Sequence, residues 1–123
     1  MEDATIISRK TPKYRRPVEK DEFSLSWALR KTPLVLTKTR RYTIGSLKKH
    51  HVSLPQQTTS SLHASLKWEK KAFMLRDEKS TNGTFLNDKR VEEPVALADG
   101  DRIKVGKYVI QFHVKKVRVK KVL

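Results

Sequence analysis

The sequence predicts an all-β protein, either a sandwich or a barrel, with an extended N-terminal arm. Two observations carry this prediction. Short segments rich in β-branched and aromatic residues recur along the middle of the chain, and turn residues separate them at close intervals. No segment of helical periodicity lies between these strands, which is typical of sandwiches and barrels rather than of mixed folds.

The expected strands follow one another from residue 34 to residue 112. They cover residues 34–36, 41–44, 51–54, 63–68, 72–77, 84–86, 102–105 and 108–112. In the fourth of them Ala64, Leu66 and Trp68 share one face, because side chains alternate along a strand. The polar stretch at 69–71 predicts a hairpin, and Asn82-Gly83 predicts a tight turn that needs a positive φ. Residues 23–30 fit a short helix and a strand equally well.

Charge divides the chain into three parts. The 123 residues carry a formal net charge of +15 at pH 7, which predicts attraction to an anionic partner. We expect a basic extended arm over residues 1–22, the folded domain over 23–114, and a basic tail or a linker to a further domain over 115–123. The last segment alternates Val with Lys and Arg, so an edge strand or the start of a helix also remains open.

The residue inventory excludes several classes of protein. The chain has no Cys, which excludes disulfides and thiolate sites and favours a cytoplasmic or other intracellular setting. No apolar run approaches membrane-spanning length. No zinc-ligand spacing, phosphate-binding Gly-Lys-Ser/Thr loop or framed nucleophilic serine is present, so we expect no enzyme, no cofactor and no metal. His50 and His51 are adjacent, and on a strand their rings would point to opposite faces.

Four motifs in a fixed order resemble a forkhead-associated (FHA) domain over roughly residues 33–113. The four motifs are Ile44-Gly45-Ser46, Ser60-Ser61-Leu62-His63-Ala64, Asp77 to Asn87 with Ser80-Thr81-Asn82-Gly83-Thr84 inside it, and Leu97 to Gly106. The resemblance implies a two-sheet β-sandwich of about eleven strands. It also implies that loops at one end of the sandwich hold a phosphothreonine peptide.

The resemblance assigns roles to residues of these loops. Ser60 would donate its hydroxyl to a phosphate oxygen, and Ser61 occupies a position where the family often has Arg or Asn. Thr81 would line the pocket, and Asn82 would hold the peptide main chain through its amide, which both donates and accepts. The remaining expected residues support the loops structurally and are Gly45, His63 and Gly83.

The chain departs from the family pattern at one important position. Ser46 stands where the family places an arginine on the phosphate. A hydrogen bond to a charged group contributes about 1.5–3 kcal/mol, so its loss predicts phosphate binding weakened by roughly ten- to a hundredfold. Lys48 and Lys49 follow in the same loop and could neutralise the phosphate, although lysine lacks the bidentate fork of arginine.

Three hypotheses for the function follow. The first is a phosphothreonine-binding signalling module, whose ligand is a partner protein or the chain's own arm phosphorylated at Thr5 or Thr11. The second is a degenerate module that binds proteins without phosphate, as Ser46 and Ser61 suggest. The third is charge-driven nucleic-acid binding, which is disfavoured because the aromatic residues lie in strand patterns rather than in a stacking series. These aromatic residues are Tyr42, Trp68, Phe73, Phe85 and Phe112.

Overall fold

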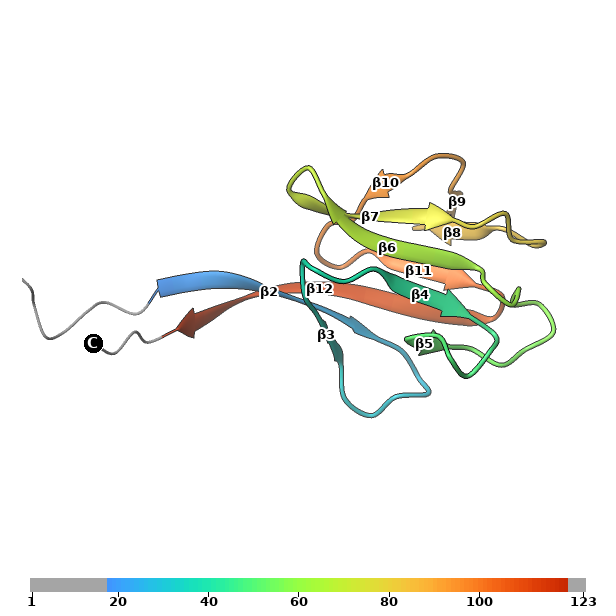
Figure 1. The fold of residues 1–123 in the computed structure, drawn as a ribbon, viewed down its shortest axis with the longest axis horizontal. Coiled ribbons are helices and arrows are strands. Elements are labelled where there is room, and N and C mark those ends of the chain that lie inside the picture. Colours follow the sequence, from blue (N-terminus) through green and yellow to red (C-terminus); the bar gives the residue numbers. More distant parts are fainter. Residues whose placement is uncertain (1–17, 120–123) are drawn as a thin grey trace, which may run out of the picture.

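The computed structural model describes residues 18–119, which fold into two β-sheets without a helix. The eleven strands are β2 (Val18–Ser26), β3 (Leu34–Leu36), β4 (Tyr42–Gly45), β5 (Val52–Ser53), β6 (Ala64–Glu69), β7 (Ala72–Asp77), β8 (Thr84–Leu86), β9 (Lys89–Arg90), β10 (Val95–Ala96), β11 (Arg102–Val105) and β12 (Tyr108–Val119). One sheet has the order β10-β7-β6-β4-β5, and the other has the order β3-β2-β12-β11-β8-β9. The all-β sandwich expected from the resemblance is therefore confirmed (Figure 1).

The hydrophobic core lies between the two sheets and draws on both of them. Phe23 of β2 contacts Trp68 and Phe73 of the facing sheet, with ring centroids 5.3 and 5.2 Å apart. Phe112 of β12 lies 6.1 Å from Phe73 in an edge-to-face arrangement, which is a favourable geometry for aromatic rings. Tyr42, Phe73 and Phe112 are buried, and Trp68 and Phe85 are half-buried. The aromatic side chains named in the sequence are thus used for packing.

A two-stranded ribbon extends the six-stranded sheet beyond the sandwich. β2 and β12 pair antiparallel from Gln111 with Ser26 to Val119 with Val18, and Figure 1 shows the two strands projecting together from one end of the molecule. The expected boundaries after residue 22 and before residue 115 therefore fall inside strands. Ion pairs support the ribbon: Lys116 Nζ lies 2.7 Å from Asp21 Oδ1, and Lys115 Nζ lies 3.6 Å from Glu22 Oε1.

The tight turns of the chain have positive φ angles, which glycine, asparagine and aspartate adopt more readily than lysine does. Lys70 and Lys71 join β6 to β7 with φ of 51° and 70°, and Gly83 has φ of 89°. Asn87 and Asp88 also have positive φ, 48° and 72°, and join β8 to the short strand β9. A turn with two consecutive positive φ values matches the twist of a hairpin. Residues 18–119 include no helix long and apolar enough to cross a membrane.

Candidate functional site

The candidate residues gather at the end of the sandwich opposite the β2–β12 ribbon. The loops from β4 to β5, from β5 to β6 and from β7 to β8 all leave the five-stranded sheet or return to it at this end (Figure 1). The turn between β11 and β12 joins them, because the amide of Lys107 donates to Gln56 Oε1 at 2.9 Å. Four segments that are distant in sequence therefore form one surface, which we call the loop end.

His63 is fully buried beneath the loop end and connects two of its loops. Its Nδ1 accepts a hydrogen bond from the amide of Ser60 at 3.0 Å, which places the ring proton on Nε2. Nε2 in turn donates to the carbonyl of Gly83 at 2.9 Å. The main-chain amide of His63 donates to the carbonyl of Ile44 at 2.8 Å. One side chain thus fixes the Ser60 turn relative to the Asn82-Gly83 turn.

Ser60 is the point at which three loops meet. Its carbonyl accepts from the amide of Ser46 at 3.0 Å, and its hydroxyl oxygen accepts from the amide of Thr81 at 3.0 Å. Within residues 18–119 no acceptor takes the Ser60 hydroxyl proton, so the hydroxyl can donate to a ligand. Ser60 is half-buried, whereas Ser61 and Thr81 are exposed beside it.

Asn82 ties the β7–β8 loop to the β5–β6 loop. Its side-chain nitrogen donates to the carbonyl of Thr58 at 3.1 Å, which leaves its second N–H and its amide oxygen for a ligand. Gly83 turns the chain back with its positive φ, and its amide donates to the Ser80 hydroxyl at 3.0 Å. Asn82 is exposed, so the fixed amide faces solvent at the loop end.

Gly45 provides the space in which the first two loops contact each other. A Cβ at this position would lie 2.1 Å from the carbonyl oxygen of Ser61 and 2.5 Å from Cδ2 of His50. Both distances are far below van der Waals contact, so only glycine fits here. The His50 ring is buried against this glycine, with Nδ1 3.0 Å from Thr43 Oγ1 and with no hydrogen-bond partner for Nε2 within the described residues.

The expectation that the rings of His50 and His51 point apart was wrong. Both rings approach Thr43: His51 Nδ1 accepts from the Thr43 amide at 3.0 Å, and His50 Nδ1 lies near the Thr43 hydroxyl. The reason is that both histidines precede β5 in a loop, so strand alternation does not apply to them. Burial and the neighbouring charges of Arg40 and His50 lower the pKa of His51.

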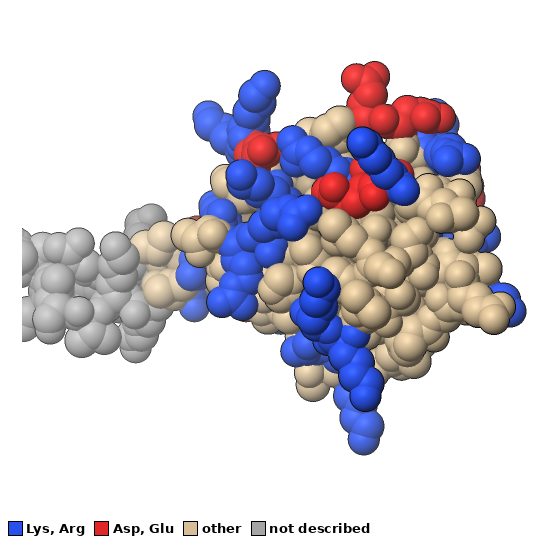
Figure 2. Space-filling model, turned by 45° about the vertical axis from the view of Figure 1, so that its right-hand side comes forward, with Lys and Arg blue, Asp and Glu red and all other residues tan. Residues whose placement is uncertain are grey.

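Ser46 carries no charge, and the nearest cations in the sequence are two lysines of the same loop. Ser46 is half-buried, and its amide is held by Ser60. Lys48 and Lys49 are exposed and form no ion pair with any residue between 18 and 119. Figure 2 shows Lys and Arg side chains in separate groups on this face, with carboxylates in its upper part and a broad area of uncharged residues between the groups. The loop that follows Ser46 therefore supplies positive charge through two lysines and contains no arginine.

Two pockets flank the Ser60–Asn82 centre, and the sequence had not indicated them. A pocket of about 260 Å³ lies on the Ser61 side and is lined by Arg41, Thr43, Leu47, Lys49, His50, Ser61 and Leu62. A pocket of about 270 Å³ lies on the Asn82 side and is lined by Thr58, Asn82, Gly83, Phe85, Lys104, Gly106 and Lys107. Both linings combine cations with polar groups and contain no carboxylate. Among residues 18–119 no cluster of three metal-ligating side chains occurs.

Asp77 anchors the turn that carries Thr81 and Asn82, and we predict that it makes this turn sensitive to acid. The carboxylate accepts from the hydroxyl and the amide of Ser80 and from the Thr84 hydroxyl. Burial acts to raise the pKa of Asp77, but these hydrogen bonds outweigh it and hold the pKa below its ordinary value of 3.8.

A carboxyl whose pKa is depressed in the folded state stabilises the fold above its unfolded pKa, and this stability is lost as pH falls through the folded pKa. Urea unfolding midpoints at pH 7 and pH 3 should therefore differ more in the wild type than in Asp77→Asn. Glu92→Gln, which removes an exposed carboxylate that has no ion pair within residues 18–119, is the matched control. Equal pH dependence of the wild type and Asp77→Asn would contradict the prediction.

The fold and the loop end define a class of protein: a two-sheet β-sandwich that presents fixed hydroxyl and amide groups on loops at one end. A family model for the FHA domain matches residues 42–106, which contain all four expected motifs and end at Gly106. The chain belongs to the FHA domain family. The resemblance seen in the sequence is thereby confirmed.

Individual relatives agree with this assignment. The chain is 31% identical over 90 residues to the mouse protein "Angiogenic factor with G patch and FHA domains 1", covering 65% of this chain and 13% of that protein. It is 35% identical over 72 residues to the FHA domain-containing protein FhaA of Mycobacterium tuberculosis, covering 57% of this chain and 14% of that protein. The chain therefore spans only about a seventh of the length of these relatives.

Solved FHA domains have the same fold. One, described in a structural and functional analysis of phosphothreonine-dependent FHA domain interactions, has a TM-score of 0.69 and 27% identity, over 78% of this chain and 99% of that one. The FhaA FHA domain, solved in complex with the intracellular domain of another protein, has a TM-score of 0.64 and 28% identity, over 76% of this chain and 100% of that one. FHA neighbours of this chain are thus phosphothreonine-dependent peptide-binding modules.

Proposed function

We propose that this chain binds peptides phosphorylated on threonine at its loop end. The observation that carries the proposal is the Ser60 hydroxyl, which the Thr81 amide holds in place while its own proton stays available. Ser61 and Thr81 add exposed hydroxyls on either side, and the Asn82 amide is fixed by Thr58. A phosphothreonine brings close to two negative charges and three acceptor oxygens, which suit such a set of donors.

Lys48 and Lys49 supply the positive charge in this proposal. Both are exposed in the loop that follows Ser46, and a lysine neutralises phosphate as a point charge without fixing its orientation. Binding that depends on mobile lysines should weaken as salt increases, because salt screens exposed charges. The second candidate function, protein binding without phosphate, is favoured by Ser46 itself, since that position lacks the fork that would hold the phosphate.

One titration separates the two candidates. A phosphothreonine peptide and its unphosphorylated twin, taken from a peptide library selected on this chain, are titrated by calorimetry. We expect the phosphopeptide to bind at least about tenfold more tightly, and Ser60→Ala to reduce this preference by roughly tenfold, since each charge-assisted hydrogen bond contributes about 1.5–3 kcal/mol. Ser24→Ala, on β2 outside the loop end, is the control. Equal binding of both peptides would favour phosphate-independent binding.

The partner in this proposal is a phosphothreonine protein or a phosphorylated arm of the same chain. Thr5 and Thr11 lie outside the described residues. The β2–β12 ribbon nevertheless limits how an arm could be bound. The 12 residues of β12 separate the loop end from the Val119–Val18 pair, a strand length of about 36 Å.

Thr11 lies seven positions before Val18, and seven residues reach at most about 25 Å. Binding of phosphorylated Thr11 by the loop end of a second copy is therefore easier than binding by its own. We expect phosphorylation to produce dimers whose fraction rises with protein concentration in light scattering. Thr5→Ala and Thr11→Ala, made singly, identify the site, and Ser60→Ala should abolish the dimer. A phosphorylated chain that stays monomeric at every concentration would count against binding between copies.

The proposal also covers the compartment in which the module acts and the domain that acts with it. Because the chain has no cysteine, we place it in a reducing, intracellular compartment. We further propose that a separate output domain of a longer protein acts on the bound partner, as in a recognition module for signalling.

Deletion of the basic segments at 1–17 and 120–123, followed by a gel shift at two salt concentrations, would measure any nucleic-acid binding driven by charge alone.

A further inference from the structure

The pocket on the Ser61 side is lined by the residue next to Ser60 in the chain, and we call it the lateral pocket. Thr43 of β4 and Arg41, which directly precedes β4, lie on the outer side of the sheet, because Tyr42 and Ile44 between and beside them are buried in the core. The other lining residues come from the loops before β5 and β6, and Ser61 belongs both to this lining and to the loop end. A ligand held at Ser60 can therefore continue into the lateral pocket.

The charge of the lateral pocket is positive. Lys49 is exposed and forms no ion pair within residues 18–119, and Arg41 is held in place by Glu78 at 3.1 Å. No carboxylate lines the lateral pocket. The two pockets near the ribbon differ in this respect, since Glu19, Asp21 and Glu22 line one of them and Glu22 and Asp99 line the other. The lining thus distinguishes the lateral pocket from the two pockets near the ribbon, and it shares its lack of carboxylates with the pocket on the Asn82 side.

The shape of the lateral pocket suits a short aliphatic stem. Leu47 and Leu62 are 46% and 36% exposed, and they form an apolar rim. The buried ring of His50 stands against Gly45 and keeps the two loops that carry these leucines in contact. A lining that combines exposed leucines with exposed cations fits a side chain with methylene groups below a charged head.

We infer that the lateral pocket binds a glutamate or aspartate side chain of the same peptide, within about three residues of the phosphothreonine; this inference rests on the proposed function. An extended peptide advances about 3.3 Å per residue, so a neighbour of the phosphothreonine seated at Ser60 reaches a pocket that begins at Ser61. A carboxylate suits this pocket better than a second phosphate, because Arg41 is already shared with Glu78 and Lys49 supplies one free cation. The pocket would then supply binding energy that the missing arginine at position 46 does not.

The test is a double-mutant cycle between peptide and protein. Phosphothreonine peptides carry a single Glu or Gln at each of the three positions before and after the phosphothreonine, and their affinities are measured by calorimetry. At one position we expect Glu to bind about tenfold more tightly than Gln, as for one charge-assisted hydrogen bond. Lys49→Met should bring this ratio below about twofold while leaving the apolar stem in place.

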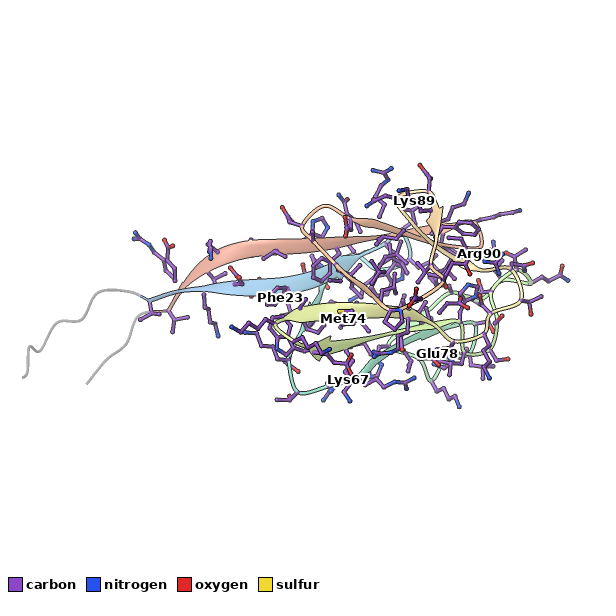
Figure 3. All side chains as sticks on the ribbon, turned by 90° about the horizontal axis from the view of Figure 1, so that it is seen from above. Phe23, Lys67, Met74, Glu78, Lys89 and Arg90 are labelled. Carbon is purple, nitrogen blue, oxygen red and sulfur yellow. The ribbon has the colours of Figure 1, made fainter. Side chains whose placement is uncertain are left out.

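The control variant is Lys67→Met. Lys67 is an exposed lysine of β6, paired in register with Met74 and set farther from the loop end than Glu78 (Figure 3). Lys67→Met removes one positive charge from the outer face of the five-stranded sheet. The ratio of Glu-peptide to Gln-peptide affinity should therefore stay at about tenfold in this variant. Loss of the ratio in both lysine variants would overturn the inference, because long-range charge rather than the lateral pocket would explain it.

A second measurement locates the side chain without relying on affinity. The chain has no cysteine, so Leu62→Cys introduces a single thiol at the rim of the lateral pocket. A peptide with Cys at the identified position should form a mixed disulfide with Leu62→Cys and not with Lys67→Cys. Equal binding of phosphorylated and unphosphorylated peptides would refute the proposed function itself. A strong phosphate preference with no Glu-over-Gln ratio at any position would refute this inference alone.

Discussion

Replacing Ser46 by arginine is expected to tighten phosphothreonine-peptide binding by roughly ten- to a hundredfold, as one charge-assisted hydrogen bond of about 1.5–3 kcal/mol predicts. The backbone for this gain is already in place, because the Ser46 amide donates to the carbonyl of Ser60 at 3.0 Å. A side chain at position 46 therefore starts from backbone that is bonded to the Ser60 turn. Arginine would add a planar fork to a site whose present cations, Lys48 and Lys49, are exposed and unpaired within residues 18–119.

Two further variants separate the effect of the planar guanidinium at position 46 from the effect of its positive charge. Ser46→Lys places a point charge at the same position and should gain less than Ser46→Arg. Gln57→Arg adds the same charge to an exposed position of the neighbouring loop and should change affinity only slightly at physiological salt, because exposed charges are screened. If Ser46→Arg leaves the affinity of the phosphopeptide unchanged, phosphate does not sit at this end of the sandwich, or position 46 does not face it.

Replacing His63 by alanine is expected to lower the free energy of unfolding by about 2–4 kcal/mol, since it both opens a buried cavity and leaves buried hydrogen-bonding groups unpaired. The ring is fully buried and bonded at both nitrogens, to the Ser60 amide and to the Gly83 carbonyl. The loss should also loosen the Ser60 and Gly83 turns, so that peptide affinity falls even under conditions in which the variant remains folded.

Chemical denaturation measures the first effect, and peptide titration at low temperature measures the second. His113→Ala is the matched control, because His113 is only half-buried and bonds through one nitrogen to Ser26 Oγ at 2.7 Å. It should cost less stability and should leave peptide affinity unchanged, since Ser26 lies outside the loop end. A His63→Ala variant that is as stable as His113→Ala would show that the buried ring does not hold the loops together.

Local sequence patterns predicted the strands that carry the core. The segment 72–77 forms β7 with the same bounds, and Ala64 and Leu66 alternate into the core as expected. These strands have one apolar face, and burial of that face determines their register. The Asn82-Gly83 turn was equally predictable from the sequence, because glycine adopts the positive φ of this turn without steric cost.

The strands with little burial were the ones missed. β9 and β10 have two residues each, which is too short for a periodicity to indicate them. The outer part of β12 alternates valine with lysine and arginine, and its burial pattern is mostly exposed. It is a strand because β2 pairs with it along its full length, and such pairing between distant segments is not visible in either segment alone.

The candidate site was likewise predictable from the sequence only in part. The motifs name Ser60, Thr81 and Asn82, but the bond from the Thr81 amide to the Ser60 hydroxyl depends on two loops that are 21 residues apart. The lateral pocket was not foreseeable, because Arg41 and Lys49 look like ordinary surface charges in the sequence. Their significance comes from the fold, which sets them beside Ser61.

The β2–β12 ribbon also determines how the domain would respond to mechanical force. Val18 and Val119 are paired residues, so a pull between them separates the two strands one pair at a time, as in opening a zipper. The sandwich itself would experience this force only after the ribbon had opened, because β3 pairs with β2 from Phe23 inward and β11 pairs with β12 as far as Gln111. Strain transmitted along a longer protein would thus be absorbed at the end of the domain that is remote from Ser60.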